Sequence, residues 1–374
     1  MIYRLLYSEW LRDQVSGFNV FGYITFRAAM AALTALLLSV MLGPWLIARL
    51  RESQIGQEIR EEGPSTHAAK SGTPTMGGLL ILVSIFVSTL FWGDLQNLSV
   101  LVCLGSTAVF GAIGFIDDSR KVRGRQSLGL TPRQKLVLQV VAAAGVGAFV
   151  LWQAEVGAVD LRLGVPFIKD FTPDISFFYL PLSVLVIVGA ANAVNLTDGL
   201  DGLAIGSTGI AFTAYTAVAY VVGHAGLSKY LGVLQVSSAA EVTVFCASVV
   251  GAALGFLWFN CPPAAVFMGD TGSMGLGGAI GTVAVVIKQE LMLLLIGGLF
   301  VIEALSVMLQ VASFKLTGTR IFKMAPIHHH FEAHRRDVPS RLAGHQWAES
   351  QVVVRFWILA ILFAVVGLSS LKVR

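Results

Sequence analysis

Charged residues are scarce in this sequence. Only 13% of its 374 residues are Asp, Glu, Lys or Arg and 55% are hydrophobic, whereas soluble domains carry about 25% charged residues. The mean hydropathy of +0.76 lies far outside the soluble range. The formal net charge of +4 is small for this length and indicates no nucleic-acid partner. The composition therefore predicts an integral membrane protein.

Cysteine is also rare, and no secretory signal peptide is recognisable. Cys103, Cys246 and Cys261 lack the spacing of a disulfide framework or a CxxC motif, so we expect them to be packing residues. Residues 1–20 carry four charges and no small-residue cleavage site. With aromatic residues such as Trp10 suited to the headgroup layer, this stretch predicts an interfacial N-terminal segment.

Ten apolar runs are long enough to cross a bilayer, which takes about 20 residues for ~30 Å of hydrocarbon. They cover residues 22–48, 75–92, 98–116, 132–152, 177–194, 203–223, 240–259, 273–288, 291–314 and 352–371. We therefore predict an all-α integral membrane protein of about ten transmembrane helices, with one polytopic domain over residues 1–374.

The lysines and arginines orient these spans. The loops after the first, third and ninth spans carry four, six and seven of the 26 Lys and Arg residues, and such loops face the cytoplasm. An even number of spans then places both termini outside. Residues 159–171 alternate apolar and polar around Gly164 and Pro166, which predicts a short exterior β-hairpin.

The polar motifs all fall in loops predicted to be cytoplasmic. They are KSGTPTMGG from Lys70, DDSRKVRGRQ from Asp117, NAVNLTDGLDG at 192–202, NCPPAAVFMGDTGSMG from Asn260 and APIHHHFEAHRR from Ala325. One active site at the cytoplasmic face explains this distribution better than five unrelated loops.

The aspartates of these motifs require a cation nearby. An Asp near mid-bilayer costs roughly 2.5–3.5 kcal/mol on insertion scales, and clustered carboxylates repel one another. Mg²⁺ or Mn²⁺ needs only one or two carboxylates and shares its remaining positions with phosphates and water. Helix capping or pairing with lysines is the alternative for any single aspartate. The aspartates are Asp117, Asp118, Asp198, Asp201 and Asp270.

The N-termini of the second, fourth and eighth spans open on the same face and favour anions through their free N–H groups. Lys70 precedes the second span. Thr131 and Pro132 form a cap signal for the fourth, with Lys135 one turn later. The eighth opens at Gly269. Four later glycines of that span are expected to serve close helix packing: Gly275, Gly277, Gly278 and Gly281.

Two loops leave alternatives open. In NAVNLTDGLDG, Asn192 pairs with Asn195 and Asp198 with Asp201 at i, i+3 spacing, so each pair shares a face if the segment is helical. The two DG steps instead favour a break in the helix. Such a cluster can bind a metal, or it can read a nucleobase or a sugar. Phe267 could stack on a base, although a lone loop Phe more often packs.

The histidine motif and one intramembrane acid also leave alternatives. His328, His329 and His330 suit phosphate oxygens or a sugar, or they are structural. Zinc is disfavoured because HFEAH lacks the HExxH order. Glu303 lies inside the ninth span, where it either supports the site or satisfies a local partner.

The motifs DD at 117–118, NAVNLTDGLDG, FMGDTGS at 267–273 and PIHHHFE at 326–332, on ten spans, resemble the polyprenyl-phosphate N-acetylhexosamine-1-phosphate transferase superfamily. The PIHHHFE form resembles its phospho-N-acetylmuramoyl-pentapeptide transferase branch, over essentially the whole chain. The resemblance implies a Mg²⁺-dependent homodimer in the bacterial cytoplasmic membrane. It implies transfer from UDP-N-acetylmuramoyl-pentapeptide to undecaprenyl phosphate, giving UMP and lipid I for peptidoglycan.

The same resemblance implies residue roles. Asp117 and Asp118 would lie near the lipid phosphate, with Asp117 as the base, and Asp270 would ligate Mg²⁺; these three are the candidate catalytic and metal residues. Adding Lys121, Lys135, Asp201 and His328 from the motifs themselves, the candidate substrate-binding residues are Lys70, Thr75, Lys121, Lys135, Asn192, Asn195, Asp198, Asp201, Asn260, Phe267, His328, His329 and His330.

Other interpretations of the sequence stay open. Within the superfamily, a transferase for UDP-N-acetylglucosamine is the closest alternative, and an aspartyl-phosphate intermediate would make the reaction two-step. A secondary transporter would show polar residues at the bilayer midplane, and an intramembrane metalloprotease would need its zinc motif inside a span.

Overall fold

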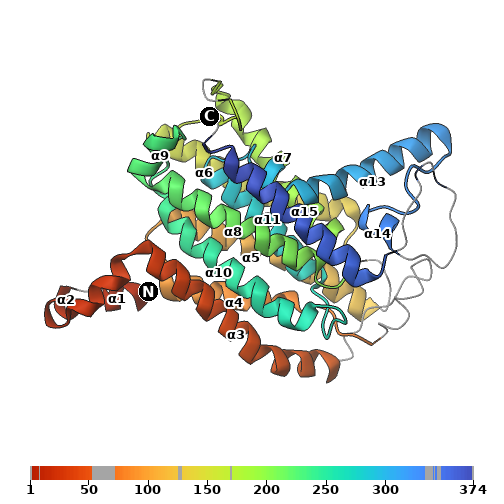
Figure 1. Ribbon diagram of the computed structural model, residues 1–374, viewed down its shortest axis with the longest axis horizontal. Coiled ribbons are helices and arrows are strands. Elements are labelled where there is room, and N and C mark those ends of the chain that lie inside the picture. Colours follow the sequence, from red (N-terminus) through yellow and green to blue (C-terminus); the bar gives the residue numbers. More distant parts are fainter. Residues whose placement is uncertain are drawn as a thin grey trace.

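The protein is a bundle of long helices (Figure 1). The computed structural model describes residues 2–7, 9–52, 72–124, 129–168, 171–332, 340, 342 and 347–372, which include no β-strand. The long helices are α3 (Ile24–Glu52), α4 (Gly78–Trp92), α5 (Leu98–Gly124), α6 (Pro132–Glu155), α7 (Tyr179–Thr197), α8 (Leu203–Gly223), α10 (Ala239–Asn260), α11 (Gly269–Val286), α13 (Gly298–Thr317) and α15 (Glu349–Ser369). The short helices are α1 (Ile2–Leu6), α2 (Glu9–Gln14), α9 (Ala225–Leu231), α12 (Leu293–Ile296) and α14 (His328–Phe331), with 3₁₀ turns at Ser16–Gly22 and Ser176–Phe178.

Each of the ten expected spans overlaps one long helix, and the ninth is divided at Gly297 into α12 and α13. Among the described residues, eight helices are long and apolar enough to cross a membrane. The other two are α4, which is apolar but only 15 residues long, and the glycine-rich α11. The protein is therefore a multi-pass helical membrane protein, whereas the count of ten spans stays a prediction.

Helix α11 is the centre of the bundle (Figure 1). Every residue from Thr271 to Val286 is buried, and α4, α5, α6, α7 and α8 all contact this helix. A Cβ at Gly278 would lie 2.4 Å from the ring of Phe110 on α5. A Cβ at Gly281 would lie 2.7 Å from the Cα of Ile187 on α7. The expected role of these glycines in close helix packing is confirmed, because no side chain fits in their place.

The two chain ends lie on the left of the bundle in Figure 1, whereas α14 lies on the right. This agrees with an even number of spans, while the side of the membrane to which each end belongs stays a prediction. The expected exterior hairpin is represented by a single antiparallel bridge between Arg162 and Asp174. No strand extends from this bridge in the described residues, so a full hairpin is not established.

Two of the three cysteines pack in the core, as expected. Cys103 and Cys246 are buried, whereas Cys261 is exposed at the end of α10, where the packing expectation is wrong. The N-terminal segment forms α1 and α2, and Trp10 is exposed. An ion pair between Arg4 and Asp94 joins α1 to the loop after α4, with a closest N···O distance of 2.9 Å.

The packing of α11 leads to a stability prediction. Gly281→Ala places a methyl group against the backbone of α7, and overpacking of this kind costs about 1–3 kcal/mol. The melting temperature in detergent should therefore fall. Gly189→Ala on α7 is the matched control, because nothing lies within 4 Å of where its Cβ would stand and alanine is the better helix former. Equal melting temperatures for the two variants would contradict the packing role.

Candidate active site

Three aspartates from two helices meet at one end of the bundle. Asp117 and Asp118 lie near the C-terminus of α5, and Asp270 is the second residue of α11. Each of the three offers an oxygen within 4.8 Å of the others, and Asp117 and Asp118 are buried. The backbones approach closely because residue 114 is glycine: a Cβ there would lie 2.1 Å from the carbonyl oxygen of Asp270.

Asp118 caps the N-terminus of α11 from a neighbouring helix. Its Oδ1 accepts a hydrogen bond from the Asp270 backbone N–H at 3.1 Å. Its Oδ2 accepts from the Thr271 N–H at 2.9 Å and from the Thr271 hydroxyl at 2.7 Å. A carboxylate is favourable at this positive end of a helix. Asp118 thus fixes where α11 begins.

Three helix N-termini were expected to offer free N–H groups to phosphates, and this is wrong for the N–H groups that have a partner within the protein. At the start of α11, the N–H groups of Asp270 and Thr271 donate to Asp118. The N–H groups of Gly77 and Gly78, at the start of α4, donate to the carbonyls of Phe267 and Met268. In the α6 capping box, the Gln134 N–H donates to the Thr131 hydroxyl, as the cap signal predicts. These particular donors are occupied within the protein and are therefore not offered to a phosphate.

Two lysines balance the aspartates. Lys121 Nζ lies 2.6 Å from Asp117 Oδ2 and 2.9 Å from Asp270 Oδ2. Lys135 Nζ, from α6, lies 2.9 Å from Asp270 Oδ2 and 3.9 Å from Asp117 Oδ2. Three carboxylates and two ammonium groups leave a formal charge of −1, which a divalent cation would turn into +1. That balance suits a site for anionic phosphates.

The two asparagines of NAVNLTDGLDG lie on α7 and join this cluster. Asn195 Nδ2 lies 2.8 Å from both Asp270 Oδ1 and the Ser273 hydroxyl. Asn192 Nδ2 donates at 2.8 Å to Gln139 Oε1 of α6, one turn beyond Lys135. The asparagine pair is therefore helical, as one alternative predicted. The helix ends at the first DG step, so the break predicted by the other alternative holds for the aspartate half of the motif.

The turn that follows α7 packs against the end of α10. Asp198 is partly buried; loss of hydration raises its pKa well above the usual value, and the charges of Asp270, Asp118 and Asp201 raise it further. Buried Asp201 accepts a hydrogen bond from the Ala264 N–H at 3.0 Å.

Asn260 is buried, and both the oxygen and the nitrogen of its side-chain amide form hydrogen bonds with backbone groups. Its Oδ1 accepts from the Gly202 N–H and its Nδ2 donates to the Val266 carbonyl. Asp201 and Asn260 thus hold the turn after α7 against the loop between α10 and α11.

Two of the three histidines of α14 are held by carboxylates. His328 Nδ1 lies 3.1 Å from Glu303 Oε2, and both side chains are fully buried. His329 Nδ1 lies 2.9 Å from Glu332 Oε2. His330 Nδ1 instead accepts from the Lys323 backbone N–H at 3.0 Å. Glu303 thus has a local partner, His328, whereas its support of the site stays a prediction.

The two carboxylate-held imidazoles face the turn after α7. A Cβ at Gly199 would lie 2.3 Å from His328 Nε2 and 3.1 Å from His329 Nε2. The His328 Nε2 atom has no hydrogen-bond partner among the described residues. Hydrogen bonds join Asp118, Asp270 and Asn195, and Gly199, one turn further along the chain, lies against His328. The motifs are therefore neighbours at this end of the bundle, as one site requires.

Two further candidates, Thr75 and Phe267, lie beside the start of α11. Thr75 is buried, and its hydroxyl would lie 3.0 Å from a Cβ at Gly269. Phe267 is partly buried, and its backbone N–H donates to the Pro74 carbonyl at 2.8 Å. Lys70 lies outside the described residues, so the structure does not bear on its role.

The residues fit a divalent cation of the magnesium type. Asp117 and Asp270 each present an Oδ2 atom to the lysines, and Mg²⁺ needs only one or two carboxylates when phosphates and water complete its octahedron. Asp118 uses both oxygens on α11, which suits a positioning role better than a ligand role. The absence of thiolates and the presence of hard oxygen donors favour Mg²⁺ or Mn²⁺ over softer metals.

The sequence patterns missed several positioning residues. Gln139 and Ser273 hold the two asparagines, Thr271 binds Asp118, and Glu332 binds His329. Helical spacing would have indicated Gln139, four residues after Lys135, and Ser273, three after Asp270. Nothing in the sequence indicates that the Glu349 carboxylate accepts a hydrogen bond from the Asp201 N–H at 3.0 Å.

The comparisons with known proteins agree with this geometry. The profile described as glycosyl transferase family 4 matches residues 100–288, which contain the acids of α5 and α11. A multi-pass helical protein with this site is thus a membrane-bound transferase of glycosyl transferase family 4. A signature of phospho-N-acetylmuramoyl-pentapeptide-transferases matches residues 70–82.

Full-length relatives identify the family. Phospho-N-acetylmuramoyl-pentapeptide-transferases from Koribacter versatilis and Pelobacter propionicus are each 51% identical, and one from Desulforapulum autotrophicum is 52% identical. Every alignment covers 100% of both chains. The chain belongs to the phospho-N-acetylmuramoyl-pentapeptide-transferase family, and it is an enzyme.

The Glu303–His328 pair leads to a testable prediction. Glu303→Gln replaces the carboxylate that contacts His328 Nδ1 with an amide, and loss of an orienting partner of a histidine typically costs 10–100-fold in activity at metal sites. We expect a similar fall in transferase turnover, with a melting temperature close to that of the parent protein. Glu52→Gln, at an exposed position on α3, should leave turnover unchanged. Equal turnover in the two variants would exclude a role for the pair.

Proposed function

We propose that the enzyme transfers phospho-N-acetylmuramoyl-pentapeptide from UDP-N-acetylmuramoyl-pentapeptide to undecaprenyl phosphate, in peptidoglycan synthesis at the cytoplasmic membrane. The products are UMP and the lipid-linked sugar. The observation that carries the proposal is the cluster of Asp117, Asp270, Lys121 and Lys135 at the ends of three helices. There, a phosphate on a membrane lipid can meet a phosphate on a soluble nucleotide. The names of the relatives support the donor.

The chemistry exchanges one pyrophosphate for another. An oxygen of the lipid phosphate forms a bond to the β-phosphorus of the nucleotide sugar, and the bond from that phosphorus to the oxygen bridging to UMP breaks. A phosphate monoester has a second pKa near 6 and is already largely ionised at neutral pH. The site therefore needs charge screening more than it needs a strong base, and Asp117 would orient the attacking phosphate or take its last proton.

The lysines supply that screening from the protein side. Lys121 and Lys135 reach the carboxylates from α5 and α6 and can turn to phosphate oxygens at the same place. When bound at Asp117 and Asp270, Mg²⁺ would neutralise developing charge on the transferred phosphoryl group.

Nucleotide and sugar recognition would fall to the adjoining surface. The imidazoles of His328 and His329 face the turn at 198–202 and lie closest to it at Gly199. We assign the sugar and its phosphate to these imidazoles and the uracil to Phe267, which is partly exposed. One polytopic domain, cytoplasmic orientation of the site and a homodimer belong to the same proposal.

Asp270 provides the test of the metal assignment. Asp270→Asn should lower UMP release by 10²–10³-fold or more, as the loss of a key electrostatic contact does, and should abolish its Mg²⁺ dependence. The fold should persist, as judged by melting temperature. Asp160→Asn is the control, because Asp160 also forms an ion pair, with Arg162 at 2.5 Å, but in an exposed loop. Full activity of Asp270→Asn would defeat the assignment.

Donor specificity separates the proposal from a transferase for UDP-N-acetylglucosamine. We expect the purified enzyme, given undecaprenyl phosphate and Mg²⁺, to release UMP from UDP-N-acetylmuramoyl-pentapeptide and not from UDP-N-acetylglucosamine. The measurement is UMP formation with each nucleotide sugar in turn. Release from the second donor alone would replace the proposed function with that alternative.

A further inference from the structure

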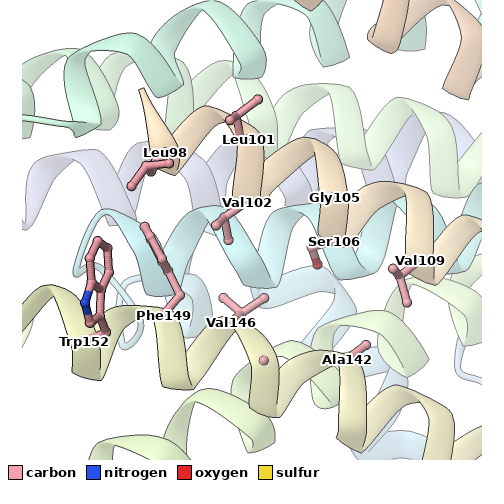
Figure 2. A pocket seen from close by; sticks show the side chains of 11 residues that line it. Leu98, Leu101, Val102, Gly105, Ser106, Val109, Ala142, Val146, Phe149 and Trp152 are labelled. Atoms are coloured by element: carbon pink, nitrogen blue, oxygen red, sulfur yellow. The ribbon is translucent and has the colours of Figure 1, made fainter. Parts of the chain in front are cut away.

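A nucleotide sugar is polar and negatively charged, so its binding site needs polar walls. The cavity of about 430 Å³ between α5 and α6 (Figure 2) does not provide them. Eleven described residues line it and none of them is charged, and the Ser106 hydroxyl is already bonded to that of Thr282 at 2.7 Å. Polar groups instead gather where the turn at 198–202 meets α14 at Gly199. The residues that support these two walls should therefore govern how the donor binds.

Two side chains of α15 bind the backbone of the turn at 198–202. Glu349, the first residue of α15, accepts a hydrogen bond from the Asp201 N–H through its Oε1, at 3.0 Å. Trp357, further along the same helix, donates its indole N–H to the Gly202 carbonyl at 3.2 Å. Because both bonds are made to main-chain atoms, they fix the course of the chain rather than the position of one side chain.

The indole of Trp357 lies directly against the backbone of α8. A Cβ at Gly206, on α8, would lie 2.4 Å from the indole Nε1, so a larger residue there would displace the ring. Gly202 has a φ of +80°, which glycine adopts without strain. The two glycines thus allow the close approach that brings the indole N–H to the Gly202 carbonyl.

Helix α15 and the residue Trp347 before it support α14 as well. The Trp347 backbone N–H donates to the Phe331 carbonyl at 2.8 Å, and the two rings stack with their centroids 4.9 Å apart. The ring of Phe356, on α15, meets that of Phe331 edge-on at a centroid distance of 6.1 Å. Phe331 is the last residue of α14, which carries the three histidines. The same segment of the chain therefore holds both walls of the donor site.

A small buried apolar cluster joins these parts of the chain. Its buried members include Leu200 in the turn and Val352 and Val353 on α15, and Phe331 of α14 packs against it. By contrast, the acids and lysines of the active site contact one another across α5, α6, α7 and α11. A change in α15 should thus alter donor binding and leave the acidic cluster in place.

We propose that Glu349 and Trp357 are positioning residues of the donor site. They hold the turn at 198–202 opposite the imidazoles of His328 and His329 and thereby set the affinity for the nucleotide sugar. This inference rests on the proposed function and adds to it two residues that lie outside the polar motifs. Neither residue needs to touch the substrate, because each acts through the backbone of the turn.

Glu349 gives the sharper test, because alanine and glutamine separate its hydrogen bond from its charge. Glu349→Ala should raise the KM for UDP-N-acetylmuramoyl-pentapeptide about three- to tenfold, the range that loss of one hydrogen bond gives. The kcat should stay at its parental value, because binding is lost equally in the ground state and the transition state. The KM for undecaprenyl phosphate should also stay unchanged. Glu349→Gln should keep the parental KM for the donor, because its amide oxygen can accept the same hydrogen bond.

Trp357→Phe tests the second contact. It removes the indole N–H and keeps an aromatic ring beside Gly206, so the KM for the nucleotide sugar should again rise about three- to tenfold. Trp258→Phe is the matched control, because Trp258 is 73% exposed on α10, and it should leave both KM values unchanged. Since Trp357→Phe retains most of the packing, it decides the question if Glu349→Ala does not fold.

The outcomes lead to different conclusions. If the wild-type enzyme neither binds nor turns over UDP-N-acetylmuramoyl-pentapeptide, the proposed function itself fails. If it does both, and folded Glu349→Ala or Trp357→Phe keeps the parental KM for this donor, only the inference fails. The inference also fails if Glu349→Gln raises that KM as much as Glu349→Ala, which would assign the effect to charge at the start of α15. An equal rise in the KM for undecaprenyl phosphate would indicate a general loss of structure and would overturn the inference as well.

Discussion

The capping of α11 by Asp118 is the contact on which the candidate active site depends. Three charge-assisted hydrogen bonds from the start of α11 converge on this one carboxylate, and bonds of that kind contribute about 1.5–3 kcal/mol each. They hold Asp270 beside Asp117, against the repulsion of like charges. Gly114 makes the approach sterically feasible. Lys121 and Lys135 then offset the clustered negative charge. The cap thus fixes the first turn of α11 relative to α5, together with the contacts of Lys121 and Asn195 to Asp270.

The far end of α11 is anchored by a second buried polar cluster. Lys288 Nζ lies 3.1 Å from Glu290 Oε1 and 3.6 Å from the ring centre of Tyr179, whose hydroxyl donates to Glu290. Lys288 and Glu290 are essentially inaccessible. A charged pair buried this deeply tolerates little displacement, because separation would leave an uncompensated charge. With both ends fixed and a glycine-lined middle against α5 and α7, α11 forms a rigid support for Asp270.

Local sequence signals predicted most of the fold, and three-dimensional partners account for what they missed. The apolar runs located every long helix, and the Thr131 cap signal was right because capping involves only neighbours in the chain. By contrast, only the contacts of α11 with its neighbours show that this helix is the core of the bundle. The motifs predicted which residues gather, but the pairing of Glu303 with His328 joins positions 25 residues apart. At the N-termini of α4 and α11, the paired backbone donors bind groups that are distant in sequence, whereas the α6 donor binds its own cap residue.

Several backbone donors at the helix N-termini are already paired, whereas the lysine side chains of the cluster can move to meet phosphate charge. Lys121 and Lys135 both contact Asp270 Oδ2, one of the oxygens best placed to ligate a divalent cation. The ammonium groups and such a cation therefore compete for one atom. An ammonium group is a compact charge on a flexible stem, so a lysine displaced from the carboxylate can turn to a phosphate oxygen nearby. The arrangement couples cation binding to phosphate binding through the two lysines, while the acids and α11 need not move at all.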